Sequence, residues 1–260
     1  MSFSSDHDRA LSDAFDGQAS QFERAPVQTD PMALDRLVRH SGFPAGSRVL
    51  DAGCGPGLVS AALLQAGYRV VGVDLSREMI DRARARCEGQ PGAAEFHQAS
   101  LHDANLDGLA PFDGALSRYV LHHVPDPMAF VRRQVSLLRP GGILVLNDHL
   151  TDPDRELAGR HEAIERARDG THTRNLTGGG LVDLLARAGL ERIHYLEEPF
   201  VLDFDEWFDR GTPELPKARV REMILDGPPI RGFAPSLLDD GSIRIECVRG
   251  FVKGVKPARA

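Results

Sequence analysis

A glycine-rich turn directly after a buried strand constrains this chain more than any other feature. Residues 49–57 read VLDAGCGPG, and the pattern predicts a strand, a tight turn and a helix over residues 58–65. Glycines occupy alternate positions of this turn: Gly53, Gly55 and Gly57. Glycine reaches positive φ angles without penalty and lets a ligand approach the backbone closely. The amides at the start of the following helix, with the positive end of its dipole, then face that ligand.

Two carboxylates flank the turn. Asp74 ends a second apolar stretch, residues 68–73, where an acid can accept hydrogen bonds from both hydroxyls of a ribose. Asp51 precedes the turn and could hold the loop or accept a hydrogen bond from a ligand ammonium group. Nicotinamide-dependent oxidoreductases use a similar turn, but their G-x-G-x-x-G spacing would require glycine where this chain has Leu58. The turn therefore predicts a nucleotide-like ligand and disfavours a nicotinamide cofactor.

Apolar strands alternate with helical periodicity along most of the chain. Strands are predicted at about 48–52, 68–73, 93–97, 112–117, 142–148, 191–204 and 242–252. Two helices, 8–24 and 31–41, precede them, and Asp30 is the predicted N-cap of the second. Thr177 is the predicted N-cap of a later helix that ends at Gly189. Strands that alternate with helices indicate an α/β fold with a parallel sheet and right-handed crossovers.

Four motifs in sequence order resemble those of class I S-adenosylmethionine-dependent methyltransferases. They are the turn at 49–57, the strand end at 70–76 with Met79, the segments 112–117 and 121–127, and the turn at 137–146. The resemblance is closest to the small-molecule branch that includes the quinone-biosynthesis C-methyltransferases, and it covers residues 45–150 strongly and 175–198 more loosely. It implies a Rossmann-like seven-stranded sheet, mostly parallel with an antiparallel last strand, with helices on both faces and a small helical lid.

The resemblance also implies S-adenosylmethionine as cofactor and S-adenosylhomocysteine as product. The residues it assigns to cofactor binding are Asp51, Gly53, Gly55, Gly57, Asp74, Leu75, Met79, Ser100, Leu101 and Ser117. Ser100 stands where the family usually has an acidic residue that accepts a hydrogen bond from the adenine amino group. A serine hydroxyl can also accept this hydrogen bond, but the bond is weaker because the hydroxyl carries no charge. Arg118 stands where many relatives have a small or amide residue. It could bind an anionic acceptor or the cofactor carboxylate, or it could extend to solvent.

Four segments are expected from these patterns. Residues 1–44 form an N-terminal helical lid, 45–204 the cofactor-binding core, 205–240 a lid insertion, and 241–260 the final core strand and tail. The insertion is too short and too interrupted by proline to be a domain of its own.

Methyl transfer from a sulfonium mainly requires alignment of the acceptor and exclusion of water. A general base is needed only when the acceptor holds a proton. The candidate catalytic residues near the predicted crevice are His123, His149 and Tyr119, each of which could instead have a structural role. His122 and His172 are further candidates, and Phe15 and Phe22 could either close over the methyl group or only pack the lid. Asp148 is the only carboxylate expected near the fifth strand, so no metal is predicted.

Composition favours a cytoplasmic enzyme with a small-molecule substrate. The formal net charge of −7 and the lack of a basic stripe disfavour nucleic acid as a partner. No apolar run approaches the roughly 18 residues that span a bilayer, and residues 1–8 lack the features of a secretory signal. The three cysteines have no metal-ligand spacing, which suggests a reducing compartment.

Several alternatives remain at this point. The oligomeric state is left open between a monomer and a homodimer. The same fold and cofactor could catalyse a cyclisation or rearrangement instead of methylation, and a nicotinamide-dependent oxidoreductase or a catalytically silent regulatory subunit is less favoured.

Overall fold

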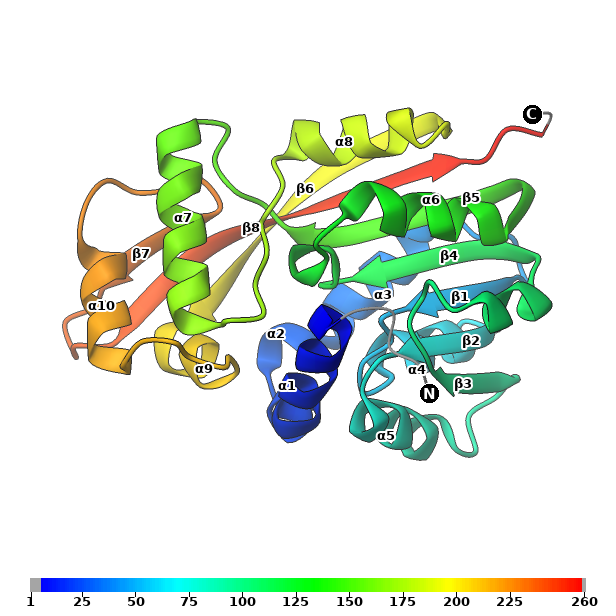
Figure 1. Ribbon diagram of the computed structural model, residues 1–260, viewed down its shortest axis with the longest axis horizontal. Coiled ribbons are helices and arrows are strands. Elements are labelled where there is room, and N and C mark those ends of the chain that lie inside the picture. Colours follow the sequence, from blue (N-terminus) through cyan, green and yellow to red (C-terminus); the bar gives the residue numbers. More distant parts are fainter. Residues whose placement is uncertain (1–5, 259–260) are drawn as a thin grey trace.

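A mixed sheet forms the centre of the computed structural model, which describes residues 6–258 (Figure 1). The strand order is β3-β2-β1-β4-β5-β8-β6, and β7 pairs with the outer half of β8. The strands from β1 to β5 pair in parallel, whereas β8 is antiparallel to β5, β6 and β7. The strands are β1 (Arg48–Ala52), β2 (Arg69–Asp74), β3 (Ala94–Gln98), β4 (Phe112–Arg118), β5 (Leu138–His149), β6 (Glu191–Asp203), β7 (Phe233–Leu237) and β8 (Ile243–Val255).

Helices cover both faces of this sheet because its strands alternate their apolar side chains between the two faces. Leu50 of β1 packs in the cluster that contains residues of α6 and α8, whereas Val49 packs in the cluster that contains residues of α3, α4 and α5. The helices are α1 (Asp6–Phe22), α2 (Pro26–Thr29), α3 (Pro31–Ser41), α4 (Leu58–Gln65), α5 (Arg77–Cys87), α6 (Pro127–Leu137), α7 (Arg155–Arg168), α8 (Gly178–Arg187), α9 (Phe204–Asp209) and α10 (Lys217–Leu225), with short 3-10 turns at Ala104–Leu109 and Leu121–His123.

The predicted helix caps are confirmed. The Asp30 carboxylate accepts from the Met32 amide at the start of α3, at 2.9 Å. The Thr177 hydroxyl accepts from the Gly180 amide at the start of α8, at 3.0 Å. None of the helices within residues 6–258 combines the length and the apolar character that a bilayer crossing requires. The prediction that no secretory signal is present rests mostly on residues 1–5, which lie outside the described residues.

The mostly parallel seven-stranded sheet with an antiparallel last strand is confirmed, and within the described residues one short further strand, β7, pairs with β8 outside that order. The extra strand, β7, was expected to belong to an insertion without strands. Its sequence, FAPSL, is short and contains Pro235, and its last residues are exposed. Proline is tolerated there because β7 pairs on one side only, with β8. Such a strand carries almost no period-2 signal in the sequence.

Residues 205–240 form part of a separate lobe at the end of the long strands β6 and β8 (Figure 1, left). The helices α9 and α10 and the strand β7 pack there with α7, and Trp207, Ile224 and Phe233 lie in one buried cluster. This placement differs from the expected lid insertion, because no residue of 205–240 lines the main pocket described below. The apolar side chains of the segment find partners on α7 and on the two strands instead.

The helix α1 lies across the junction between β2 and α5. The Ser12 hydroxyl donates to the carbonyl of Leu75 at 3.1 Å. The Asp16 carboxylate accepts from the Ser76 hydroxyl at 2.5 Å and from the Glu78 amide at 3.2 Å. These bonds fix the N-terminal helix over the carboxyl end of β2.

Substitution of Trp207 tests the packing of the lobe. Trp207 is 3 % exposed and its ring centroid lies 5.3 Å from that of Phe233. We expect Trp207→Ala to lower the free energy of unfolding by about 3–5 kcal/mol, because a large buried ring leaves a cavity. Leu237→Ala, at a position 55 % exposed, should change it by less than about 0.5 kcal/mol. Urea unfolding of both variants measures the difference, and equal effects would contradict this packing.

Candidate functional site

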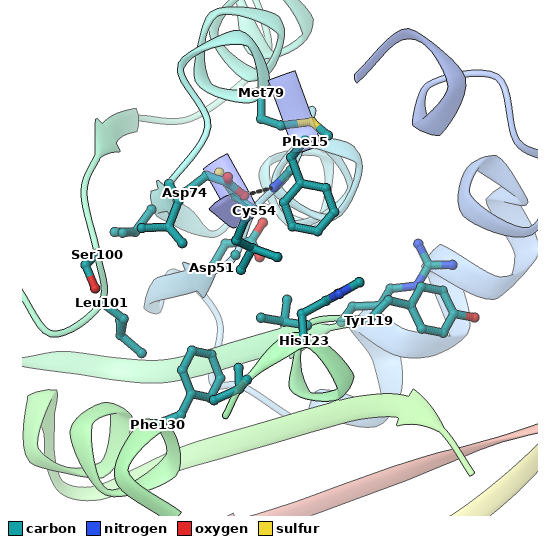
Figure 2. Close-up of a pocket in the computed structure, with 18 of the residues that line it drawn as sticks. Phe15, Asp51, Cys54, Asp74, Met79, Ser100, Leu101, Tyr119, His123 and Phe130 are labelled. Carbon is teal, nitrogen blue, oxygen red and sulfur yellow. Dashed lines mark hydrogen bonds between the residues drawn. The ribbon is translucent and has the colours of Figure 1, made fainter. Parts of the chain in front are cut away.

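The main pocket lies at the carboxyl ends of the parallel strands, beneath α1 (Figure 2). Its volume is about 310 Å³. Ligands of open α/β sheets bind at this edge, where successive connections diverge. The predicted cofactor residues that line it are Asp51, Gly53, Gly55, Asp74, Leu75, Met79, Ser100 and Leu101, and the predicted catalytic residues that line it are Tyr119 and His123.

The turn after β1 folds back onto the end of β2. The amides of Gly53 and Cys54 both donate to the carbonyl of Val73, at 2.8 and 3.1 Å. A Cβ atom at Gly55, whose φ is +51°, would meet no protein atom within 4 Å. Gly57 does not line the pocket. With φ at +79°, it brings α4 against α5, because a Cβ there would lie 2.8 Å from the Cα of Ala83.

Asp74 ties the same turn to the end of β2. One carboxylate oxygen accepts from the Gly55 amide at 2.8 Å, and the other accepts from the Ser76 amide at 3.0 Å. Burial raises the pKa of the Asp74 carboxyl, although these two amide bonds oppose the shift. The carboxylate therefore lies at the pocket wall with its charge only partly balanced by backbone amides.

Asp51 is buried beneath the turn. It accepts from the Ser60 hydroxyl of α4 at 2.6 Å. Burial raises the pKa of Asp51 to about 7, with a further rise from Asp74, while the hydrogen bond from Ser60 lowers it. This contact agrees with the predicted role of holding the loop, and the residue also lines the pocket.

One side of the pocket is formed by the segments after β2 and β3 and by α6. Figure 2 shows Ser100 and Leu101 on this side, with Met79 above and Phe130 below the open space. The sequence analysis did not assign Phe130, although it lies on an apolar face of the helix that follows one of the quoted motifs. Gln28, in the short helix α2, also lines the pocket, and no sequence signal marked it.

His123 lies on the opposite side, edge-to-face with the ring of Phe15 at 5.0 Å between centroids (Figure 2). Its Nδ1 is 3.3 Å from the carbonyl oxygen of Thr171 and 3.1 Å from the hydroxyl of the same residue. That hydroxyl donates to the Asp169 carboxylate at 2.6 Å. Because a carbonyl only accepts, we assign the proton to Nδ1, which leaves the lone pair on Nε2.

The charge state of His123 follows from its surroundings. Burial lowers the pKa of His123 well below its usual range, and the neighbouring His122 and His172 lower it further. His122 behaves differently, because its Nδ1 lies 2.6 Å from the Asp148 carboxylate. Burial lowers the pKa of His122, but the charge of Asp148 and its hydrogen bond outweigh this effect, so the pKa is raised. His123 is therefore neutral at pH 7.

Tyr119 lines the pocket with its ring and not with its hydroxyl. Its φ of +58° is unusual for a bulky residue and sets the direction of the ring. The hydroxyl oxygen accepts from Arg249 at 2.7 Å, and the ring stacks on His149 at 4.6 Å between centroids. These contacts give Tyr119 a packing role in the pocket wall.

Besides Gly57, two more of the predicted site residues, Ser117 and His149, do not line the pocket. Ser117 precedes Arg118 on β4 and points to the other face, because successive strand residues alternate. Its hydroxyl donates to Gln134 of α6 at 3.2 Å. His149 lies behind Tyr119, with its ring 5.2 Å from that of Phe200. Burial lowers the pKa of His149 to about 3, and His122 contributes to that decrease.

Within residues 6–258 no three His, Cys, Asp or Glu side chains are grouped as the ligands of a metal ion would be. The pocket residues offer backbone amides, carboxylates that include those of Asp51 and Asp74, and aromatic rings instead.

Comparisons with known proteins point to one kind of domain. The family described as "Methyltransferase domain" matches residues 28–195. The ubiquinone biosynthesis O-methyltransferase of Xylella fastidiosa (strain 9a5c) is 31 % identical over 187 residues, which cover 70 % of this chain and 74 % of that protein. The protein of the same name from Xanthomonas campestris pv. campestris (strain B100) is 36 % identical over 118 residues, 45 % of this chain. The chain spans about half the length of that relative, 49 %.

Solved structures share the fold. A putative methyltransferase from Bacillus halodurans C-125 aligns with a TM-score of 0.74 and 24 % identity, over 87 % of this chain and 99 % of that chain. The magnesium protoporphyrin IX methyltransferase from Synechocystis PCC 6803 with bound SAH aligns with a TM-score of 0.58 and 17 % identity, over 96 % of this chain and all of that chain (100 %). The predicted resemblance to quinone-biosynthesis methyltransferases is confirmed, and the relatives named above are O-methyltransferases, whereas the predicted branch was that of the C-methyltransferases.

The half-buried His149 predicts a specific dependence of stability on pH. The pKa of His149 is about 3 in the folded protein against an ordinary 6.5, so the unfolded chain binds one more proton between these values. The contribution of the neutral His149 to the free energy of unfolding is present above about pH 6.5 and is lost as the pH falls toward 3. We expect His149→Gln to reduce the loss between pH 6.5 and 4.5 by about 1.4 kcal/mol per pH unit.

Urea unfolding at several pH values measures this slope. The matched control is His194→Gln, at an exposed position of β6, which should leave the slope unchanged. Parallel pH profiles for the wild type and His149→Gln would contradict the assignment of a neutral imidazole at His149.

Proposed function

The chain belongs to the methyltransferase-domain family, and from this premise we propose that it transfers the methyl group of S-adenosylmethionine to a small-molecule acceptor. The observation that carries the proposal is the meeting of the open glycine turn and the Asp74 carboxylate at one edge of the sheet. Gly55 leaves the backbone bare where a ligand would lie, since a Cβ there would point into open space. Nothing in the comparisons favours the alternative chemistries of cyclisation or hydride transfer.

The pocket residues fit the cofactor in three parts. Asp74 would accept from the ribose hydroxyls, while Ser100, Leu101 and Met79 would surround the adenine. The glycine turn and Asp51 would face the amino-acid end of S-adenosylmethionine. Gly57 and Ser117 lie outside the pocket, so their proposed part is limited to supporting α4 and β4.

When bound, S-adenosylmethionine supplies an electrophilic methyl group on its sulfonium. The protein then has to exclude water and orient the acceptor. Phe15 and Phe22 of α1 line the pocket and would cover it, with their ring centroids 5.7 Å apart. The bonds of Ser12 and Asp16 to the β2–α5 junction hold this helix in place.

His123 is the residue we propose as general base for a hydroxyl acceptor. Thr171 fixes the proton on Nδ1 and Asp169 orients Thr171, so that Nε2 is free to take the acceptor proton. His149 is shielded by Tyr119, which makes it a less suitable base.

The remaining proposals concern the setting of the reaction. We propose a cytoplasmic enzyme that acts as a monomer or homodimer and does not bind nucleic acid. The net charge of −7 and the three free, buried cysteines support this proposal.

Calorimetric titration with S-adenosylmethionine and S-adenosylhomocysteine tests the cofactor. We expect Asp74→Asn to weaken binding of both by about 10- to 100-fold, because a charged hydrogen-bond acceptor is lost. Asp81→Asn, at an exposed position of the following helix α5, should bind like the wild type. Failure of the wild type to bind either compound would refute the proposed function.

Methyl transfer from labelled S-adenosylmethionine to a broad metabolite extract tests the base. We expect His123→Gln to lower the rate by about 10²- to 10⁴-fold while S-adenosylhomocysteine still binds. Because the pKa of His123 is depressed, the wild-type rate should stay level as the pH falls from 8 to about 6. A His123→Gln enzyme with a wild-type rate would exclude this role.

A further inference from the structure

A buried glutamine connects the helix α1 to the lobe. Gln18 is 5 % exposed, and its side-chain amide contacts Thr212, 194 positions later in the chain. In the orientation that satisfies its partners, the amide oxygen accepts from the hydroxyl and the backbone amide of Thr212, at 2.6 and 3.1 Å. The amide nitrogen then donates to the carbonyl of Arg210 at 3.2 Å. These bonds all lead to the segment that follows α9.

The segment that follows α9 in turn holds the end of α7. The carbonyl of Thr212 accepts from the Gly170 amide at 3.0 Å, and the Glu214 amide donates to the carbonyl of Ala167 at 3.0 Å. A Cβ atom at Gly170 would lie 2.8 Å from a carboxylate oxygen of Glu214, so the two segments are in close contact. The position of this glycine therefore depends on the segment that Gln18 contacts.

Gly170 lies between the two residues that orient His123. The Thr171 hydroxyl lies 3.1 Å from Nδ1 of His123 and donates to the Asp169 carboxylate at 2.6 Å. Asp169 is 2 % exposed, and its carboxylate also accepts from the Thr171 amide at 3.0 Å. Arg168 donates to the second oxygen of this carboxylate at 3.2 Å. A displacement of Gly170 would therefore misalign the proposed base.

The helix α1 presents apolar side chains to the pocket and buried polar side chains to other segments. Leu11, Phe15 and Phe22 line the pocket, whereas the buried Ser12 and Gln18 are bonded to the β2–α5 junction and to the lobe. In Figure 1 this helix lies between the lobe and α5. Hydrogen bonds exchange with bonds to water when two surfaces separate, so their net contribution is small. A ligand in the pocket adds apolar contacts and thus favours the closed position of α1.

We propose that Gln18 is a positioning residue, which couples the closed position of α1 to the orientation of His123. When α1 covers the pocket, Gln18 holds the segment after α9, and the Thr212 carbonyl holds Gly170 and the two residues that flank it. This inference rests on the proposed function, because it concerns the base of that reaction. Coupling between two sites is reciprocal, so a ligand that favours closure also orders the segment around Gly170. The base is therefore aligned when water is excluded from the pocket.

Variants on both sides of the contact test the coupling in the whole chain. Gln18→Ala removes the amide, and Gln18→Glu keeps an oxygen that can accept from Thr212. Thr212→Val removes only the hydroxyl, from the side of the lobe. The matched control is Gln21→Ala, at an exposed position of the same helix. Thermal unfolding checks that each variant is folded.

Three quantities are measured for each protein. Amide hydrogen exchange, followed by NMR without ligand and with S-adenosylhomocysteine, reports on Gly170 and on α1. The nitrogen NMR signals of the His123 ring report which tautomer is present. Methyl transfer from labelled S-adenosylmethionine to a broad metabolite extract gives the rate.

We expect Gln18→Ala to accelerate exchange of the Gly170 amide by at least about tenfold, because the carbonyl that accepts from it is held less firmly. The His123 ring should change from one tautomer to a mixture, and methyl transfer should slow by about 10- to 100-fold. Gln18→Glu should retain part of the protection, and Gln21→Ala should match the wild type. S-adenosylhomocysteine should slow exchange at Gly170 in the wild type but not in Gln18→Ala.

Thr212→Val should accelerate exchange both at Gly170 and in α1, by at least about threefold, because coupling acts in both directions. If Gln18→Ala does not fold, this variant decides by itself, since Thr212 is exposed and its backbone bonds remain.

Three results would overturn the inference. Exchange at Gly170 could keep the wild-type rate in both variants that weaken the contact. Exchange could instead accelerate while the tautomer of His123 and the rate of methyl transfer stay unchanged, which would make the contact a structural one only. Gln21→Ala could also reproduce every effect of Gln18→Ala. A wild type that binds neither S-adenosylmethionine nor S-adenosylhomocysteine would refute the proposed function, and exchange without ligand keeps the two failures distinguishable.

Discussion

The connection between the turn after β1 and the end of β2 determines where the pocket forms. The Gly53 amide donates to the Val73 carbonyl at 2.8 Å, and Asp74 accepts from the Gly55 amide at 2.8 Å. Parallel strands bring their carboxyl ends to one edge, but only a turn that folds onto the neighbouring strand leaves bare backbone there. The lid helix α1 depends on the same junction, because Asp16 is bonded to the first turn of the helix that follows β2.

The features that the sequence predicted are those coded by local patterns. The approximate strand ranges followed from apolar runs that alternate with helical segments, and the helix over residues 58–65 was predicted with the bounds that it has. Caps such as Asp30 and Thr177 depend on one side chain and an amide a few residues away, so they too are local. The glycine turn with Asp74 was recognisable because its spacing is fixed by the backbone conformation that it must adopt.

The features that the sequence did not predict arise from contacts between distant segments. Thr171 reaches His123 from the loop between α7 and α8, and no spacing rule links positions 48 residues apart. Ser117 and Arg118 were both plausible pocket residues, but strand alternation allows only one of them to face it, and the structure selects Arg118. The strand β7 forms only because β8 extends beyond β5 and offers it a pairing edge.

Burial acts in opposite directions on the ionisable groups of the pocket, and this difference has a functional consequence. It raises the pKa of Asp51 and Asp74 and lowers that of His123, so each of these groups moves toward its neutral form. Burial also lowers the pKa of Arg118, but an arginine starts so far above pH 7 that it remains charged. Of these four groups, Arg118 is thus the one whose charge burial cannot remove.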